Sequence, residues 1–244
     1  MKAKRILALL LVFVLAVAAL AGCKKEESSS KGEKKEEKKT ESEVQEFDGS
    51  LTSVEFAHRM GNGINLGNTM EAYGHTSIGV EGEVSAYETL WGCPVTTQEM
   101  LTAMKAAGFD TLRLPVAWTN MMDYESGDYT INKAYLDRVE EIANYALNED
   151  MYVIINDHWD GGWWGMFGSA TPETREKAMT MYKEMWTQVG ERFANYDEHI
   201  IFESANEELG NRLNDVDVAT DSGSLDLDAC YTTTNGINQA FVDT

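Results

Sequence analysis

Residues 200–207 read IIFESANE, a short apolar run that ends in the polar pair Asn206 and Glu207. This pattern is typical of a buried strand that delivers an acid to the edge of a sheet. Two earlier runs end in the same way: FDTLRLP (109–115) carries Arg113, and MYVIINDH (151–158) ends in His158. The carboxyl ends of parallel barrel strands meet at one face, where active sites form. The three runs therefore predict one polar site.

Short apolar runs alternate with amphipathic helical stretches along the rest of the chain, which predicts βα units and a parallel sheet. The expected strands are 61–67, 109–114, 151–157 and 199–205. The expected helices are 96–107 with a Thr96–Glu99 capping box, one that Asn132 caps, 171–194, and 235–244, with loops at 68–94 and 209–234. We therefore expect an α/β fold, a (β/α)8 TIM barrel of which this chain covers about the first four units.

A four-unit Rossmann-type sheet is the alternative architecture. Residues 61–67 read GNGINLG, which superficially resembles the dinucleotide-binding glycine fingerprint. The third glycine of that fingerprint would fall at Leu66, and no strand precedes the motif. The spacing therefore excludes a dinucleotide site here.

The N-terminal residues are expected to be a targeting segment. Residues 1–22 join a basic start to an apolar run too short for a spanning helix, and LAGC (20–23) follows. This resembles a bacterial lipoprotein signal and implies lipidation of Cys23, with the protein anchored on the extracellular face of the cell membrane. The alternative is an ordinary secretory signal with a coincidental cysteine. Residues 23–48, rich in Lys, Glu and Ser, are expected to be a disordered linker to a domain at 49–244.

Composition narrows the possible partners and cofactors. The formal net charge is −21, which excludes the basic footprint that nucleic-acid binding needs. The four histidines have no metal-ligand spacing, so we expect no metal and no cofactor. An exported protein permits a disulfide between Cys93 and Cys230, but two unpaired thiols are an equal alternative.

Five motifs carry a family resemblance: NLGNT (65–69), TLWG (89–92), GFDTLRLP (108–115), VIINDHW (153–159) and ESANE (203–207). Their order and their spacing at successive strand ends resemble the N-terminal half of glycoside hydrolase family 5, from about Glu55 to Thr244. The first motif is more similar to the cellulase and xyloglucanase branches than to the mannanases. The resemblance implies a retaining endo-β-1,4-glucanase that hydrolyses cellulose, xyloglucan or mixed-linkage β-glucan.

Retaining hydrolysis uses two carboxylates about 5–5.5 Å apart, an acid/base and a nucleophile. The resemblance implies that Glu207 is the acid/base, with its pKa raised by burial and by the partner carboxylate. It further implies that Asn206 binds the sugar 2-hydroxyl, that Arg113 orients the nucleophile and that His158 binds substrate. Strand parity places Glu203 on the same side as Glu207, where it is expected to support Arg113.

The family nucleophile follows the seventh strand, and we expect this chain to be the front half of a longer enzyme, with no significant turnover alone. Flat indole faces pack on pyranose rings. Trp163 and Trp164 are the best candidates for a sugar platform, and Trp159, Trp91 and Asn68 are further candidate substrate-binding residues. The alternative for each indole is hydrophobic packing at the top of the barrel.

Two other functions remain open from the sequence. One is a glycan-binding surface lipoprotein that captures sugar without cleaving it. The other is an enzyme that completes its carboxylate pair within this chain, from Asp157, Asp160 or Glu208. Alternation along the chain directs Glu208 away from Glu207, which argues against that pair.

Overall fold

The computed structural model describes residues 49–215 and 225–244, and contains a parallel sheet. The strands are β1 (Gly63–Asn65), β2 (Thr111–Leu114), β3 (Tyr152–Asn156) and β4 (Ile200–Glu203), in the order β1-β2-β3-β4. Each strand pairs with the next one along the chain, and the shared register aligns Asn65, Arg113, Ile154 and Ile201. The predicted α/β fold with four parallel strands is confirmed. The expected signal, the lipidated Cys23 and the linker lie outside the described residues.

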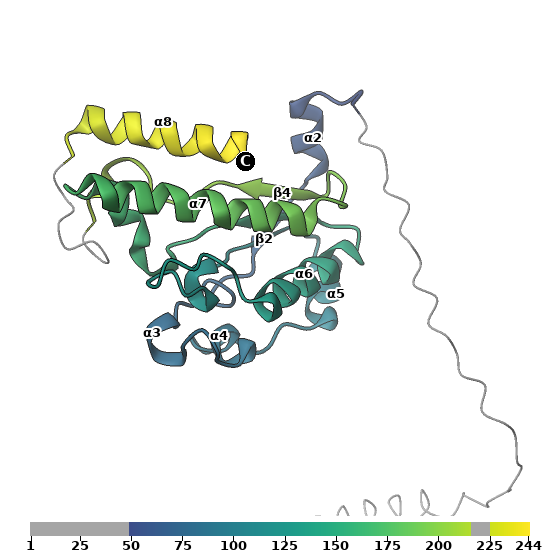
Figure 1. Ribbon diagram of the computed structural model, residues 1–244. Helices are drawn as coiled ribbons and strands as arrows, with labels where there is room; N and C mark the ends of the chain where they lie inside the picture. The colour runs from purple at the N-terminus through teal and green to yellow at the C-terminus, as the bar shows by residue number, and fades with distance from the viewer. Residues whose placement is uncertain (1–48, 216–224) are drawn as a thin grey trace, which may run out of the picture. The chain divides into compact units, whose positions relative to one another are not determined.

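Helices cover one face of this sheet (Figure 1). The α-helices are α2 (Ser53–Arg59), α3 (His75–Ile78), α4 (Val84–Glu88), α5 (Gln98–Ala106), α6 (Lys133–Leu147), α7 (Pro172–Phe193) and α8 (Leu227–Asp243). The 3-10 helices are η1 (Trp118–Met121), η2 (Asp160–Gly168) and η3 (Gly210–Asn214). Leu112, Leu114, Val153 and Ile155 are fully buried on the helix-covered face. The other face carries Arg113, Ile154 and Ile201, because successive strand residues point to opposite faces.

Helix α6 shows how local sequence sets an element. The Asn132 side chain accepts a hydrogen bond from the Ala134 amide at 2.8 Å, as its expected role as N-cap requires. Tyr135, Val139, Ile142, Ala143 and Ala146 recur at helical spacing and are all buried. The Asn132 cap therefore sets the start of α6, and the amphipathic pattern sets the face that packs on the sheet.

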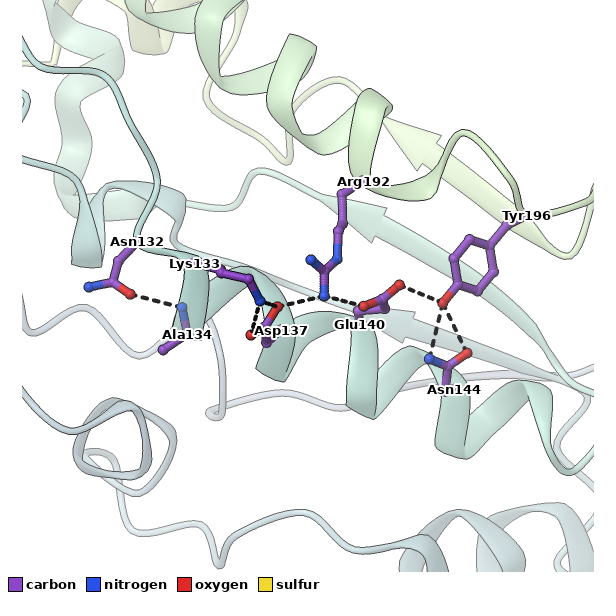
Figure 2. A network of polar contacts seen from close by, with 8 residues as sticks. All are labelled: Asn132, Lys133, Ala134, Asp137, Glu140, Asn144, Arg192 and Tyr196. Carbon is purple, nitrogen blue, oxygen red and sulfur yellow. Dashed lines mark hydrogen bonds and ion pairs between the residues drawn. The ribbon is translucent and has the colours of Figure 1, made fainter. Parts of the chain in front are cut away.

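Polar contacts on the outside tie α6 to α7 (Figure 2). Arg192 of α7 pairs with Asp137 at 2.6 Å and with Glu140, and both acids lie on α6. Tyr196, just after α7, donates its hydroxyl to Glu140 at 2.8 Å. These contacts join neighbouring helices of the outer layer.

Three local expectations are wrong. Helix α5 begins at Gln98 with no side-chain cap, because Thr96 is held by tertiary contacts: its amide donates to the buried Glu88 at 2.6 Å. The expected loop at 209–234 contains η3 and the first turns of α8, which Asp226 caps through the Ala229 amide at 2.8 Å. The expected loop at 68–94 contains α3 and α4, whose few residues carry too little periodicity to be recognised.

Two further features bear on earlier alternatives. Cys93 and Cys230 are both free thiols, so of the two alternatives the structure has unpaired thiols and not a disulfide. Among the described helices, none has the length and apolar character needed to cross a membrane.

Candidate active site

Arg113 is the centre of a polar cluster at the carboxyl ends of β2 and β4. Its Nε donates to Glu203 Oε2 at 2.7 Å, and its Nη2 lies 2.5 Å from Glu203 Oε1. The same Nη2 donates to Asn206 Oδ1 at 2.9 Å. Burial alone would raise the pKa of Glu203, but hydrogen bonding and charge from Arg113 outweigh it and lower that pKa. The expected support of Arg113 by Glu203 is therefore present.

His158 joins this cluster from the end of β3. Its Nδ1 lies 3.4 Å from the Asn156 Nδ2, which also donates to Glu203 Oε1 at 3.3 Å. Its backbone amide donates to the Val116 carbonyl at 2.9 Å, which fixes the loop. Partial burial lowers the pKa of His158, so the imidazole is neutral at pH 7. Asn156 is a member of this cluster that sequence reasoning missed, although its position at the end of a strand was visible.

Glu207 stands at the solvent side of the cluster. Its side chain is 74% exposed, and its Oε1 lies 3.2 Å from Arg212 Nη1. The burial expected for this carboxylate is thus not found in the structure, because the described elements leave the segment after β4 open to solvent. Its neighbour Glu208 is 4% exposed, and burial raises the pKa of Glu208 although Arg212 opposes the shift.

Asp157 and Asp160 are both fully buried beneath the loops, which disfavours their use as an exposed catalytic pair. Asp160 accepts hydrogen bonds from the Thr119 amide at 3.0 Å and from its hydroxyl at 2.6 Å. Burial, with the nearby Asp160 and Glu208 charges, raises the pKa of Asp157 well above its ordinary value. Burial also raises the pKa of Asp160, although the hydrogen bonds from Thr119 oppose this shift.

Trp163 and Trp164 pack in the core, which was the alternative to a sugar platform. The structure thus corrects the prediction that they bind sugar. Their side chains are 0% and 1% exposed, and their rings stack with centroids 4.5 Å apart. Gly161 and Gly162 adopt positive φ values of 73° and 77°, which turns the chain so that both indoles enter the core beside Tyr182.

Two other tryptophans keep exposed surface. Trp91 is 47% exposed on the long segment between β1 and α5. Trp159 is half-buried and meets the Tyr73 ring edge-on, with centroids 5.6 Å apart. These two indoles, not the buried pair, can present a ring face to a ligand.

Asn68 lies exposed just after β1, with a positive φ of 61°. The carboxylate of Glu71, itself 5% exposed, accepts hydrogen bonds from the amides of Asn68 and Thr69. Sequence reasoning missed Glu71. A carboxylate three residues after the amide that it accepts is half of a capping box, and this spacing is the signal that could have indicated the contact.

The cluster offers an exposed carboxylate, a neutral imidazole, amides and a guanidinium, but no evident metal centre. Within residues 49–215 and 225–244, no group of three or more His, Cys, Asp or Glu side chains could hold a metal ion. The chemistry that these groups support is proton transfer at Glu207 together with hydrogen bonding of hydroxyl groups.

Comparison with known proteins identifies relatives of this arrangement. Residues 70–244 match the family model of cellulase, glycosyl hydrolase family 5. A xyloglucan-specific endo-beta-1,4-glucanase of Bacteroides ovatus is 36% identical over 194 residues, covering 80% of this chain and 36% of the relative. Endoglucanase A of Paenibacillus barcinonensis is 37% identical over 201 residues, covering 80% of this chain and 44% of the relative.

Solved structures agree with the sequence relatives. A broad-specificity endoglucanase from Ruminococcus champanellensis with bound cellotriose superposes with a TM-score of 0.66 at 31% identity, over 79% of this chain and 52% of that one. A Bacteroides ovatus xyloglucanase in complex with a XXXG heptasaccharide superposes with a TM-score of 0.63 at 35% identity. The match covers 79% of this chain and 38% of that one. The chain thus spans about half or less of the length of the relatives that it matches.

Proposed function

The chain belongs to glycoside hydrolase family 5, and we propose that it is the N-terminal half of a retaining endo-β-1,4-glucanase. The observation that carries the proposal is the contact of Arg113 with both Glu203 and Asn206, immediately before the exposed Glu207. In this proposal, the proton-transferring carboxylate is Glu207, which directly follows an amide that Arg113 holds at the sheet edge.

Each group has a distinct role in this proposal. Glu207 protonates the glycosidic oxygen as the bond to the anomeric carbon breaks, and later removes a proton from the attacking water. Asn206 binds the 2-hydroxyl of the sugar, with its amide orientation fixed by Arg113. Arg113 provides positive charge for the nucleophile, and the neutral His158 binds a substrate hydroxyl. We expect the nucleophile in the part of the enzyme that this chain does not cover, since the chain spans 36% and 44% of the length of the two relatives.

The substrate in this proposal is a β-1,4-linked glucan. Relatives were solved with cellotriose and with a xyloglucan heptasaccharide, which supports this substrate class for the present chain. Trp91 and Trp159 provide the aromatic faces for pyranose rings. We further propose that lipidation of Cys23 anchors the protein to the extracellular face of the cell membrane, because LAGC at 20–23 matches the lipoprotein pattern.

The decisive experiment compares leaving groups in the enzyme encoded by the continued reading frame. Glu207→Gln should lower kcat on cello-oligosaccharides by about 10²–10⁴-fold, because their leaving oxygen needs a proton. The first step should be much less affected with a dinitrophenyl cellobioside, whose leaving group departs without protonation. Hydrolysis of cello-oligosaccharides at an unchanged rate by the Glu207→Gln variant would reject the proposed role.

Glycan capture without cleavage is the second candidate. Glu207 is 74% exposed and lacks the burial expected of an acid/base, whereas the exposed Trp91 can still contact a sugar. If a stop codon directly follows codon 244, this function becomes the preferred one. Retention of the chain on insoluble cellulose, with no new reducing ends released, would support it. Release of reducing ends by this chain would exclude it.

A further inference from the structure

The turn after β1 contains a residue with a positive φ, Asn68. Asn68 adopts a φ of 61°, in the left-handed region, which Asn occupies more readily than most residues with a Cβ atom. Its side chain is exposed at the carboxyl end of β1, where Asn65 is in register with Arg113 of β2. The turn therefore lies at the edge of the sheet that carries the polar cluster.

The Glu71 carboxylate holds this turn from within. It is 5% exposed, and its two oxygens accept separate hydrogen bonds, one from the Asn68 amide and one from the Thr69 amide at 2.9 Å. Two neighbouring contacts close the turn: Thr69 Oγ1 donates to the Leu66 carbonyl at 2.7 Å, and Cys93 Sγ lies 3.6 Å from the Gly67 carbonyl. Hydrogen bonds from amides to a carboxylate are stronger than those between neutral groups.

The same carboxylate acts on two members of the polar cluster. Its charge is one of the causes that raise the pKa of Arg113, after hydrogen bonding to Glu203. It also opposes the burial that lowers the pKa of His158. Arg113, Glu203 and Glu207 are the other charged groups that act on this imidazole.

We propose that Glu71 is a positioning residue for this site: at the edge of the sheet that carries the polar cluster, it holds Asn68 in the conformation that presents its side-chain amide to a sugar. The inference rests on the proposed function, because the position of Asn68 matters only in a site that binds sugar. Neither the hydrogen bonds of Glu71 to the turn nor its effect on the pKa of His158 depends on turnover, because both act between residues of this chain.

The test uses nuclear magnetic resonance on the 244-residue chain and its Glu71→Gln variant. Gln removes the charge and replaces one acceptor with an NH₂ group that repels an amide donor. We expect hydrogen exchange at the Asn68 or Thr69 amide to accelerate on the order of tenfold. We also expect the pKa of His158 to be lower in the variant, since Glu71 raises it in the wild type.

Two further variants separate the two effects. Glu71→Asp keeps the charge but shortens the side chain, so the amides should lose protection while the His158 titration stays close to wild type. Glu88→Gln is the matched control, because Glu88 is another buried carboxylate, 1% exposed, which accepts the Thr96 amide away from the cluster. It should change neither the Asn68 exchange rate nor the His158 titration.

A measurement on the wild type covers the case in which a variant does not fold. As the pH falls, the Asn68 and Thr69 amide signals should shift with the same midpoint as the Glu71 carboxyl carbon. Separate midpoints, or a Glu71→Gln variant with unchanged exchange and unchanged His158 titration, would overturn the proposal. A chain that neither binds nor cleaves glucan would still show both effects, so the two proposals fail independently.

Discussion

Arg113 and Glu203, ninety residues apart in the chain, meet through two parallel contacts of 2.7 Å and 2.5 Å. A guanidinium and a carboxylate fit each other in this two-point geometry, which fixes both side chains. Their side chains are 21% and 32% exposed, so water screens the pair only in part. The pair joins β2 to β4 across β3 and sets the orientation of Asn206.

Glu203→Gln should therefore destabilise the chain by about 1.5–3 kcal/mol at pH 7, the usual contribution of hydrogen bonds to charged groups. Because the folded pKa of Glu203 is lowered, its stabilisation is present above the ordinary pKa of a glutamate and is lost as the pH falls below that value toward the lowered folded pKa. Urea unfolding at pH 7 and pH 4 measures both effects. Lys133→Gln, at a pair whose lysine is 79% exposed, is the control and should cost less than about 1 kcal/mol. An equal loss at both pH values would contradict the prediction.

Asp157→Asn should change how stability depends on pH. The pKa of Asp157 is raised in the folded chain. Its contribution to the free energy of unfolding is therefore intact below the ordinary carboxyl range and is lost as the pH rises above that range. Relative to wild type, the variant should gain on the order of 1–3 kcal/mol between pH 4 and pH 8, the cost of a buried polar group without a hydrogen bond. Asp128→Asn is the control, because Thr130 lowers the pKa of that exposed carboxyl and the effect has the opposite sign.

Gly161→Ala should be strongly destabilising. The added Cβ would lie 2.2 Å from the Tyr73 ring, at a residue with a φ of +73°. Backbone strain and overpacking together predict a loss of about 2–4 kcal/mol in thermal or urea unfolding. Gly210→Ala isolates the backbone effect, because its φ is +70° and no atom of the described residues lies within 4 Å of the Cβ that it would add. We expect a loss of about 1–2 kcal/mol there. Equal losses at the two positions would show that Tyr73 yields to the methyl group.

Trp91→Ala and Trp164→Ala should have opposite consequences. Trp91 is 47% exposed, so its removal should weaken xyloglucan binding about fivefold or more in affinity gels while leaving stability nearly unchanged. Trp164 is 1% exposed, so its removal should cost about 3–5 kcal/mol of stability. Unaltered binding by Trp91→Ala would remove that indole from the proposed sugar site.

Much of the fold could be predicted because it depends on local pattern. Apolar runs at 109–114 and 151–157 became β2 and β3, and Asn132 caps α6 through its own side chain. The predicted helix boundaries were wrong where distant contacts compete with local ones. Thr96, for example, is held outside α5 by a hydrogen bond to the buried Glu88. Of the predicted site residues, the structure brings Arg113, Asn206 and His158 into one cluster with Glu203 and places Glu207 at its solvent side.

The sequence by itself determined the order of the strands and the residue types at their carboxyl ends, because hydrophobic periodicity and strand parity are properties of neighbouring residues. Only the tertiary structure decided which groups are buried. It places Trp163 and Trp164 in the core, leaves Glu207 in solvent, and brings Glu71 to the amides of Asn68 and Thr69. The reason is physical: burial and turn conformation depend on what packs over a residue, and those partners come from distant parts of the chain.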